Sequence, residues 1–503
     1  MKTYTLETYK NLMKDVSLLT DCDLKQAEKE EITNLTYDSN EVTPGTLFIC
    51  KGVTFKEEYL KAALSKGAVC YISAVKYDVD APFILVSDIR KAMPYLAEMY
   101  FNAPADKLKL TGITGTKGKS TTAYYIKAII DDYLKDIEKP ESAIISSIDV
   151  YDGKTLKESH ITTPETVELM RHFQNAIDSG IEYLEMEVSS QALKYDRVNQ
   201  VQFDVGIFMN ISEDHISAIE HPTFEDYFES KLRIFAQTDN AIINMDSDHY
   251  DRILHASKAA KRVITFGTKP EADVYGSHIR KVGNEIRFRV HTDKFDQDFA
   301  LTMPGLFNVE NALAAVACAY VYDIPVCYIE SGLRRARSKG RMECYMSKDN
   351  RMIAVVDYAH NKLSFEKLFG STREEYPDYD IVSIFGCPGK KAQLRRQHLG
   401  TIAGMYADKV YLVAEDPGEE PYIDISKDIA QYVEAQNCPY EMIEDRGTAI
   451  EKAILSAENK TVFLITGKGE ETRQKYGREY LDYPSDVELT LRALQIYDQI
   501  HTS

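Results

Sequence analysis

One stretch limits the possible fold more than any other, the sequence GITGTKGKST at residues 112–121. The residues before it, KLKLTGIT, alternate polar and apolar side chains as a short strand does. The residues after it place Ala123, Ile126, Ile130 and Leu134 at helical spacing. A glycine-rich turn between a strand and a helix directs backbone N–H groups and the positive end of the helix dipole at one point. The sequence therefore predicts a phosphate-binding loop inside an α/β domain.

The glycines of this loop do not follow the commonest phosphate-loop pattern, because G-x4-G-K-[ST] ending at Ser120 requires glycine where the chain has Ile113. Lys119 is placed to reach the outer phosphates of a nucleotide, and the Ser120 hydroxyl is placed to bind Mg2+. The alternative is a β-turn with solvated lysines, which the strand–helix context disfavours. The expected contacts to ATP phosphates are Gly115, Thr116, Lys117, Gly118, Lys119, Ser120 and Thr121.

Length and charge exclude several classes of protein. A chain of 503 residues is too long for one core and predicts roughly three domains. The net charge of −19 argues against a nucleic-acid or anionic-membrane partner. No window of about 18 uncharged apolar residues occurs, and the charged N-terminal stretch is unlike a signal peptide. Eight cysteines without a C-x-x-C pair fit a reducing cytoplasm rather than a zinc ribbon or a disulfide framework.

Strand and helix candidates divide the chain into three predicted domains. Residues 1–106 form a small mixed α/β domain with strand candidates LFICKG, AVCYIS and FILVSD. Residues 107–336 form a central parallel-sheet, ATPase-like domain around the phosphate loop, with YLEMEVSS, FDVGIFMNIS, NAIINMD and RVITFG as strands. Residues 337–503 form a Rossmann-like domain with MIAVVDYAH, YDIVSIFGC, KVYLVAEDP and TVFLITGKG. The last four strands end in charged, cysteine or glycine clusters, which predicts a ligand-binding edge.

Three further residues of the central domain are candidates for metal chemistry. Glu187 lies near the end of the strand YLEMEVSS, where a carboxylate binds Mg2+ or orients its water; the alternative is a surface glutamate. His215 follows the strand FDVGIFMNIS, although such a histidine is more often a structural hydrogen-bond partner than a ligand. Lys231 lies on the apolar stripe of its helix with Phe228 and Phe235. It therefore either extends to the surface or is a desolvated, chemically usable amine.

Nine motifs follow one another in the order found in the Mur ligases, the ATP-dependent enzymes that build the peptide stem of bacterial peptidoglycan. They are YDSNEVTPGTLF, TTPET, EVSSQAL, NISEDH, SKLRIF, GLFNVENALAA, GRME, DYAH and GKG. The chain therefore resembles this family over nearly its whole length, and TGTKGKST is similar to the family's own phosphate loop. The resemblance implies an ATP- and Mg2+-dependent ligase that adds the third residue to a UDP-N-acetylmuramoyl dipeptide through an acyl phosphate.

The resemblance also implies roles for matching residues. Implied catalytic residues are Lys119, Glu187, His215 and Lys231. Implied Mg2+ ligands are Ser120, Glu187, His215 and Lys231, the last as a carbamate formed with CO2. Implied contacts to the rest of ATP are Asn308, Asn311, Arg341 and Asp357. Implied contacts to the nucleotide sugar, the dipeptide or the amino acid are Ser39, Thr162, Thr163, Ser189, Arg197, Lys391 and Glu471.

The chain departs from the family where the incoming amino acid is chosen. Members that add diaminopimelate carry Asp-Asn-Pro-Arg, whereas this chain has AEDPGEEP, with Gly418 at the arginine position. Glu415, Asp416 and Glu419 make the region acidic, which favours a side chain ending in a cation and indicates L-lysine, with ornithine open. The alternative is that these acids face solvent. Lys391 replaces a family arginine and supplies charge without the bidentate fork.

Two other readings remain open. A folate polyglutamate ligase shares the central and third domains, but the extra N-terminal domain and EVSSQAL argue against it. A non-catalytic nucleotide-binding paralogue would have lost one of the four implied catalytic residues, and all four are present. The resemblance further implies a cytoplasmic enzyme, expected to be a monomer, without nucleic-acid or membrane partners.

Overall fold

The computed structural model describes residues 3–52, 55–159, 161–213, 220–283, 285–337, 340, 342–390 and 393–501. The chain forms two compact units, each assembled from separate segments. Unit 1 comprises Met1–Gly115, Ile130–Thr265 and Tyr320–Asp323. Unit 2 comprises Thr116–Ile129, Phe266–Ala319 and Ile324–Ser503.

Unit 1 begins with a five-stranded sheet in the described residues, in the order β2-β7-β6-β5-β4. Four strands are parallel, and β2 pairs with β7 as an antiparallel edge. The elements are β1 (Tyr4–Thr5), α1 (Leu6–Asp15), β2 (Leu19–Asp23), β3 (Glu31–Ile32), β4 (Asn34–Thr36), β5 (Thr46–Ile49), α2 (Glu57–Ser65), β6 (Ala68–Ser73), β7 (Phe83–Val86), α3 (Ile89–Phe101) and the 3-10 turn η1 (Pro104–Lys107).

The second sheet of unit 1 runs in the order β11-β10-β9-β12-β8-β13-β14-β15. Strands β9, β12, β8, β13 and β14 run parallel to one another, and β10 is antiparallel to β9 and β11. The elements are β8 (Lys109–Thr114), β9 (Ala143–Ile145), β10 (Asp149–Tyr151), β11 (Leu156–Glu158), α5 (Thr166–Asp178), β12 (Tyr183–Glu187), α6 (Ser190–Lys194), β13 (Phe203–Phe208), α7 (Phe224–Leu232), η2 (Arg233–Gln237), β14 (Thr238–Asn244), α8 (Tyr250–Ser257) and β15 (Arg262–Gly267).

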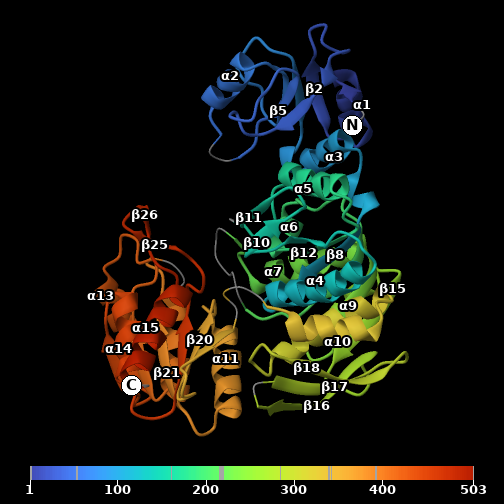
Figure 1. The fold of residues 1–503 in the computed structure, drawn as a ribbon. Coiled ribbons are helices and arrows are strands. Elements are labelled where there is room, and N and C mark those ends of the chain that lie inside the picture. The colour runs from blue at the N-terminus through green and yellow to red at the C-terminus, as the bar shows by residue number, and fades with distance from the viewer. Residues whose placement is uncertain are drawn as a thin grey trace. The chain divides into compact units, whose positions relative to one another are not determined.

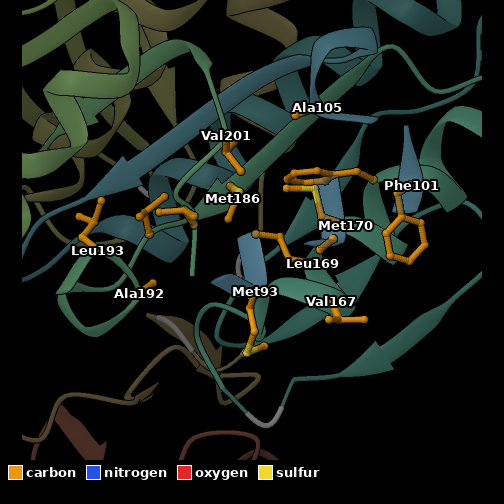
Figure 2. Packing of buried hydrophobic residues seen from close by; sticks show 14 of the residues in the cluster. Met93, Phe101, Ala105, Val167, Leu169, Met170, Met186, Ala192, Leu193 and Val201 are labelled. Atoms are coloured by element: carbon orange, nitrogen blue, oxygen red, sulfur yellow. The ribbon is translucent and has the colours of Figure 1, made fainter. Parts of the chain in front are cut away.

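One apolar core joins the two sheets of unit 1. Helix α3, which begins where the Asp88 carboxylate accepts from Arg90 N and Lys91 N, contributes Met93 and Phe101. Helix α5 contributes Val167, Leu169 and Met170, and Figure 2 shows these side chains in the same cluster as Met186 of β12. Because the two helices share this core, the N-terminal sheet and the strands that carry the candidate site are one packed body (Figure 1).

Unit 2 contains the first turns of α4 (Lys119–Asp136), an antiparallel meander and a second α/β sheet. The meander continues from the end of β15 as β16 (Val274–Val282), β17 (Glu285–His291) and β18 (Asp296–Leu301). Helices α9 (Asn308–Val321) and α10 (Val326–Arg335) follow. A Cβ on Gly332 of α10 would lie 2.5 Å from Ile129 Cα, so glycine lets α10 approach the α4 backbone closely.

The second sheet of unit 2 has the order β19-β20-β24-β21-β22-β23, with β19 as its antiparallel edge. Its elements are β19 (Glu343–Met346), β20 (Met352–Asp357), α11 (Lys362–Glu375), β21 (Asp380–Phe385), α12 (Gln393–Tyr406), β22 (Lys409–Leu412), α13 (Tyr422–Glu434), β23 (Tyr440–Met442), α14 (Arg446–Leu455), β24 (Thr461–Thr466), the hairpin β25 (Arg473–Tyr476) and β26 (Glu479–Asp482), and α15 (Asp486–His501).

The α/β class and the strands expected from the sequence are confirmed, among them β5, β6, β7, β12, β13, β14, β15, β20, β21, β22 and β24. The antiparallel strands β10, β11, β16, β17 and β18 and the hairpin β25–β26 were not anticipated. The three-domain division at residues 106 and 336 stays a prediction. In the part of the chain that the structure describes, no helix has the length and apolar composition needed to cross a membrane.

Candidate active site

The carboxyl ends of three parallel strands of unit 1 lie side by side at the start of the phosphate loop. Strand β8 pairs with β12 on one side and β13 on the other, which places Glu187 opposite Ile113 and Phe208 opposite Thr114. Gly115 follows β8 directly, so the chain leaves the sheet between the ends of β12 and β13. This is the kind of sheet edge at which open α/β folds bind ligands.

Gly115 and Lys231 meet at this edge. The φ of Gly115 is +143°, and a Cβ there would lie 2.8 Å from Met209 Cβ, so only glycine fits without strain. Lys231 Nζ donates to Gly115 O at 2.9 Å and lies 4.8 Å from the centre of the Tyr227 ring. The lysine is 2% exposed, which excludes the alternative that it extends to the surface.

Lys231 is held there by a well-capped helix. Helix α7 begins at Phe224, and the hydroxyl of its N-cap residue Thr223 accepts from Asp226 N at 3.1 Å. The helix ends at Leu232, and Phe235 belongs to the following 3-10 turn rather than to the α-helix. The buried face of α7 therefore presents Lys231 and Phe228 on its inner side.

Glu187 is buried and oriented at the end of β12. It is 1% exposed, and its Oε1 accepts from Ser147 N at 2.8 Å and from Ser147 Oγ at 3.1 Å. The surface-glutamate alternative is therefore wrong. A carboxylate fixed through one oxygen presents the other to a ligand, and carboxylate oxygens are preferred Mg2+ ligands.

The fit to a divalent cation depends on the chemical form of Lys231. As an ammonium this side chain is no metal ligand, whereas a carbamate on Nζ would add oxygen ligands near Gly115. Within the described ranges, no group of three His, Cys, Asp or Glu side chains is arranged to hold a metal ion. His215, the third candidate ligand of this unit, lies outside the described residues.

Thr163 and Ser189 connect the two segments expected to contact the dipeptide. Thr163 Oγ1 donates to Glu187 O at 2.9 Å and accepts from Ser189 N at 3.0 Å. The Ser189 hydroxyl caps α6 by accepting from Ala192 N at 3.1 Å. The loop before α5 and the loop after β12 are thus joined at the residue next to Glu187.

Arg197 lies in the same network through a residue that the sequence reasoning did not select. Its Nη2 is 2.9 Å from Glu165 Oε1, and its Nη1 donates to Thr163 O at 3.3 Å. Lys51 lies just after β5, and its Nζ donates to Glu165 Oε2 at 2.6 Å and lies 4.2 Å from the centre of the Tyr37 ring. Glu165 is part of the TTPET motif, so the motif contained the signal for this bridge.

The rest of the phosphate loop lies in unit 2. Gly118 has a φ of +87°, and Lys119 Nζ donates to Thr116 O at 3.2 Å. The side chains of Thr116, Ser120 and Thr121 are buried, and Lys117 is half-buried. Helix α4 begins at Lys119, which places the positive end of its dipole at the loop, as predicted.

The residues expected near the remainder of ATP are also in unit 2. Asn311 Nδ2 donates to Asn308 Oδ1 at 2.9 Å, and Asn308 Nδ2 donates to Pro304 O at 2.6 Å, so both amides are oriented at the start of α9. Asp357 ends β20 and accepts from Met342 N at 2.9 Å and from Ala359 N at 2.7 Å. Asn361, which departs from the family pattern, is the N-cap of α11 in a capping box with Ser364.

Glu415 is the most unusual acid of unit 2. It follows β22, is 7% exposed, and its carboxylate has no hydrogen bond or ion pair among the described residues. Burial raises its pKa from 4.5 to about 7, although the positive charges of Arg446, Arg395 and Lys468 oppose that rise. A buried carboxylate without a direct ion pair is suited to contact a cationic group of a ligand, even though three cations act on it from farther away.

The other acids of this region are paired. Asp416 Oδ1 lies 3.2 Å from Lys468 Nζ, and Glu471 Oε2 lies 2.6 Å from the same nitrogen. Tyr358 OH donates to Glu471 Oε1 at 2.6 Å. Exposed Glu419 forms ion pairs with Lys390 and Arg478. The region is thus less acidic than its sequence suggests, and Glu415 is the one of these acids without a direct ion pair among the described residues.

The remaining residues that the sequence indicated have few contacts that bear on their expected roles. Ser39 is half-buried in the turn after β4, where its carbonyl accepts from Lys66 Nζ at 2.8 Å. Thr162 is half-buried in the bend before α5. Arg341 and Lys391 lie outside the described residues. Gly418 has a φ of +60° and pairs with Tyr476 of the hairpin, a position that suits glycine.

Comparison with known proteins shows the family to which the chain is similar. Residues 113–319 match the Mur ligase middle domain, and residues 340–469 match the family described as "Mur ligase, glutamate ligase domain". The chain is 36% identical over 469 residues to a UDP-N-acetylmuramoyl-L-alanyl-D-glutamate–L-lysine ligase of Enterococcus faecalis, covering 92% of this chain and 91% of that protein. It is 38% identical over 463 residues to the enzyme of the same name from Streptococcus pyogenes, covering 92% of each chain.

A solved structure shares the fold over the whole length. It is a UDP-N-acetylmuramoyl-L-alanyl-D-glutamate–2,6-diaminopimelate ligase with a TM-score of 0.68 and 22% identity, covering 99% of this chain and 100% of that one. The fold and the site define an ATP-dependent ligase that joins an acid to an amino acid. The chain belongs to the Mur ligase family, as its ordered motifs predicted.

Proposed function

We propose that this ligase joins L-lysine to the D-glutamate of UDP-N-acetylmuramoyl-L-alanyl-D-glutamate in peptidoglycan precursor synthesis, forming ADP and phosphate. The substrate rests on the relatives named L-lysine ligases, which match over nine-tenths of the chain. The observation that carries the choice of amino acid is Glu415, a buried carboxyl group without a partner among the described residues. No cation among the described residues forms a direct ion pair with this carboxylate, and in our proposal the ε-ammonium of lysine forms that contact.

The reaction proceeds in two steps. A D-glutamate carboxylate oxygen forms a bond to the γ-phosphorus of ATP while the bond to the β-phosphate oxygen breaks, so ADP leaves. Lys119 and the loop Gly115–Thr121 bind the phosphates and offset the charge that develops on them. The neutral α-amine of lysine then attacks the acyl carbon, and phosphate leaves as the amide forms. Glu471 orients that amine.

The dipeptide is held by the network around Thr163. In our proposal Thr162, Thr163 and Ser189 contact it, and Arg197 binds one of its carboxylates, while Ser39 contacts the nucleotide sugar. Glu187, His215 and Ser120 would bind Mg2+, with Lys231 as a carbamate; the metal supplies charge neutralisation at the transferred phosphoryl group. Exclusion of water protects the acyl phosphate from hydrolysis.

The proposal also covers the contacts to ATP, the domain division and the cellular compartment. Asn308, Asn311, Arg341 and Asp357 contact the nucleotide, Lys391 supplies charge to the amino acid's carboxylate, and Asp416 supports Lys468. The division into domains 1–106, 107–336 and 337–503 is retained. All eight cysteines are free, which supports a reducing, cytoplasmic setting, and a monomer is part of the proposal without further support. No nucleic-acid partner is proposed, because the net charge is −19.

The test is ADP release by the purified protein with Mg2+, the UDP-muramoyl dipeptide and one amino acid at a time. We expect release only when all are present, with lysine preferred over ornithine and diaminopimelate, and a product heavier by one lysine residue in mass spectrometry. A preference for diaminopimelate would refute the amino-acid assignment. 18O placed in the D-glutamate carboxylate should appear in the released phosphate, and its absence there would refute the acyl-phosphate step.

The two other readings give different results in the same assay. A folate polyglutamate ligase would release ADP with a folate and glutamate, not with the muramoyl dipeptide. A non-catalytic paralogue would bind ATP without release. Glu187 and Lys231 are both buried, and Lys231 contacts Gly115. Burying a charged side chain is costly, and a protein that only binds ATP would not require it, so the burial supports a catalytic enzyme.

A further inference from the structure

Two residues that no motif singled out form a fully buried ion pair in unit 2. Arg446 is the first residue of α14 and Asp486 the first residue of α15, and each side chain is 1% exposed. Arg446 Nε donates to Asp486 Oδ1 at 2.5 Å, and Nη2 donates to Asp486 Oδ2 at 2.7 Å. Burying two charges is costly, and an apolar pair of the same volume would often stabilise a fold as well. The pair therefore calls for a role beyond packing.

The pair holds both ends of the turn that follows β24. Arg446 Nη2 also donates to Thr466 O at 2.6 Å, at the last residue of the strand. Gly469 N donates to Asp486 Oδ2 at 3.2 Å, and Asp486 N donates to Gly469 O at 3.0 Å. The segment between these points, Gly467–Gly469, is thus fixed by hydrogen bonds to one buried arginine and one buried aspartate.

This turn carries the groups that surround the candidate lysine site. A Cβ on Gly467 would lie 2.2 Å from Glu415 Oε2, so the turn packs directly against the unpartnered carboxylate. Lys468 Nζ, on the same turn, is 2.6 Å from Glu471 Oε2. A shift of the turn would move the neighbours of Glu415 and the carboxylate of Glu471 together.

The pair also acts on Glu415 by charge. The charged and titratable groups that face Glu415 come from five segments of the chain. They are Arg446 of α14, Arg395 of α12, Lys468 of the turn, and Asp416 and Cys387. Arg446 contributes most among the cations that hold the pKa of Glu415 down against its burial. It therefore increases the fraction of Glu415 that is ionised near neutral pH.

We infer that Arg446 and Asp486 are positioning residues for the amino-acid substrate: they fix the Gly467–Gly469 turn against Glu415 and keep Glu415 competent to bind a cationic side chain. The inference rests on the proposed function, since it assigns these residues to the lysine site. Neither residue touches the substrate in this account. Each acts through Glu415 or through Glu471.

The experiment compares lysine with norleucine, which has the same unbranched carbon chain without the ε-amine. The ratio of their kcat/KM values isolates the ε-ammonium contact, because the reactive α-amine is common to both. We expect the wild-type ratio to rise with pH around the pKa of Glu415, about 7. Arg446→Met should lower the plateau of this ratio about tenfold, the effect of one lost charged interaction, and move its midpoint up by about one pH unit.

A second pair of variants keeps the test decisive if Arg446→Met does not fold. Arg446→Lys retains the positive charge but loses the two parallel hydrogen bonds of the guanidinium group to Asp486. The pH midpoint of the lysine-to-norleucine ratio should therefore stay in place, while the plateau of that ratio falls several-fold. Asp486→Asn should lower the plateau similarly, because it loosens the turn. The matched control is Arg373→Lys. Arg373 likewise joins a backbone carbonyl, Tyr406 O, to an aspartate, Asp408, and contacts neither the turn nor Glu415.

The outcomes separate this inference from the proposed function. If the wild-type protein does not ligate lysine, the proposed function fails. If it does, and Arg446→Lys and Asp486→Asn keep the wild-type ratio and midpoint, the pair is only structural and the inference is wrong. An equal loss in kcat/KM for lysine and norleucine, matched by Arg373→Lys, would overturn it as well. KM values for ATP and the dipeptide should stay unchanged in all variants.

Discussion

Replacing Glu415 with glutamine should make the protein more stable and less selective. The pKa of Glu415 is raised from 4.5 to about 7, so the folded state holds this proton more tightly than the unfolded state. The folding free energy of the wild type therefore weakens as pH rises from 4.5 to 7, and the loss is complete above 7. The shift of about 2.5 pH units, at roughly 1.4 kcal/mol each, corresponds to about 3 kcal/mol.

Glutamine does not ionise, so the folding free energy of Glu415→Gln should not fall with pH through this position. The variant should match the wild type near pH 5 and exceed it by up to about 3 kcal/mol at pH 8. Urea unfolding at pH 5, 6, 7 and 8, followed by far-UV circular dichroism because the chain has no Trp, measures the difference. Glu419→Gln on the same loop is the matched control; Glu419 is exposed, so its removal should change stability little at any pH.

The same variant should lose discrimination. With Glu415 neutral at every pH, the ratio of kcat/KM for lysine over norleucine should fall and become independent of pH. Parallel loss of stability in wild type and Glu415→Gln between pH 5 and 8 would refute the reasoning, because it would mean that the carboxyl group is already solvated or paired. A more stable but less selective variant is the expected trade-off at a substrate site.

Three other substitutions test the first unit. Gly115→Ala should abolish most ADP release and destabilise the protein by about 1–3 kcal/mol, since its Cβ would lie 2.8 Å from Met209 Cβ; a fully active variant would remove the loop argument. Lys231→Ala should lose most activity, and high bicarbonate should not restore it; full activity would contradict the carbamate role. Glu165→Gln should raise KM for the dipeptide about tenfold without changing KM for lysine, because it breaks ion pairs to Arg197 and Lys51; equal KM changes for both substrates would contradict this.

Much of the fold was predictable because parallel strands buried on both faces have a simple signature. Strands such as β13 and β24 are continuous apolar runs with polar clusters at their ends. The meander β16–β18 was missed although it alternates: in β17, Ile286, Phe288 and Val290 are buried between partly or fully exposed residues. Its alternation is interrupted in β16, where the register shifts between Ser277 and Arg280.

The candidate site was less predictable where its residues form ion pairs with residues that are distant in the sequence. Glu187 was selectable because it lies near the end of a strand, and Lys231 because it lies on the apolar stripe of a helix; burial resolved the alternatives for both. Arg446 and Asp486 are the first residues of two helices 40 positions apart, where charged residues are ordinary, so only tertiary contact reveals them. The acids after β22 show the opposite case: charges adjacent in sequence suggested one acidic pocket, but Asp416 and Glu419 are neutralised by lysines and an arginine from distant segments.

The cluster around Glu415 has a consequence for how such enzymes diversify. Its members, from Tyr358 to Asp486, all come from one stretch of the chain and from one compact unit, whereas Glu187 and Lys231 belong to the other. On the proposed assignment, substitutions around Glu415 leave Glu187 and Lys231 unchanged in position, because neither residue belongs to the unit that holds the cluster. On the same assignment, the amino-acid preference of such a ligase can change through substitutions in the turn after β24 and at its two buried supports, Arg446 and Asp486.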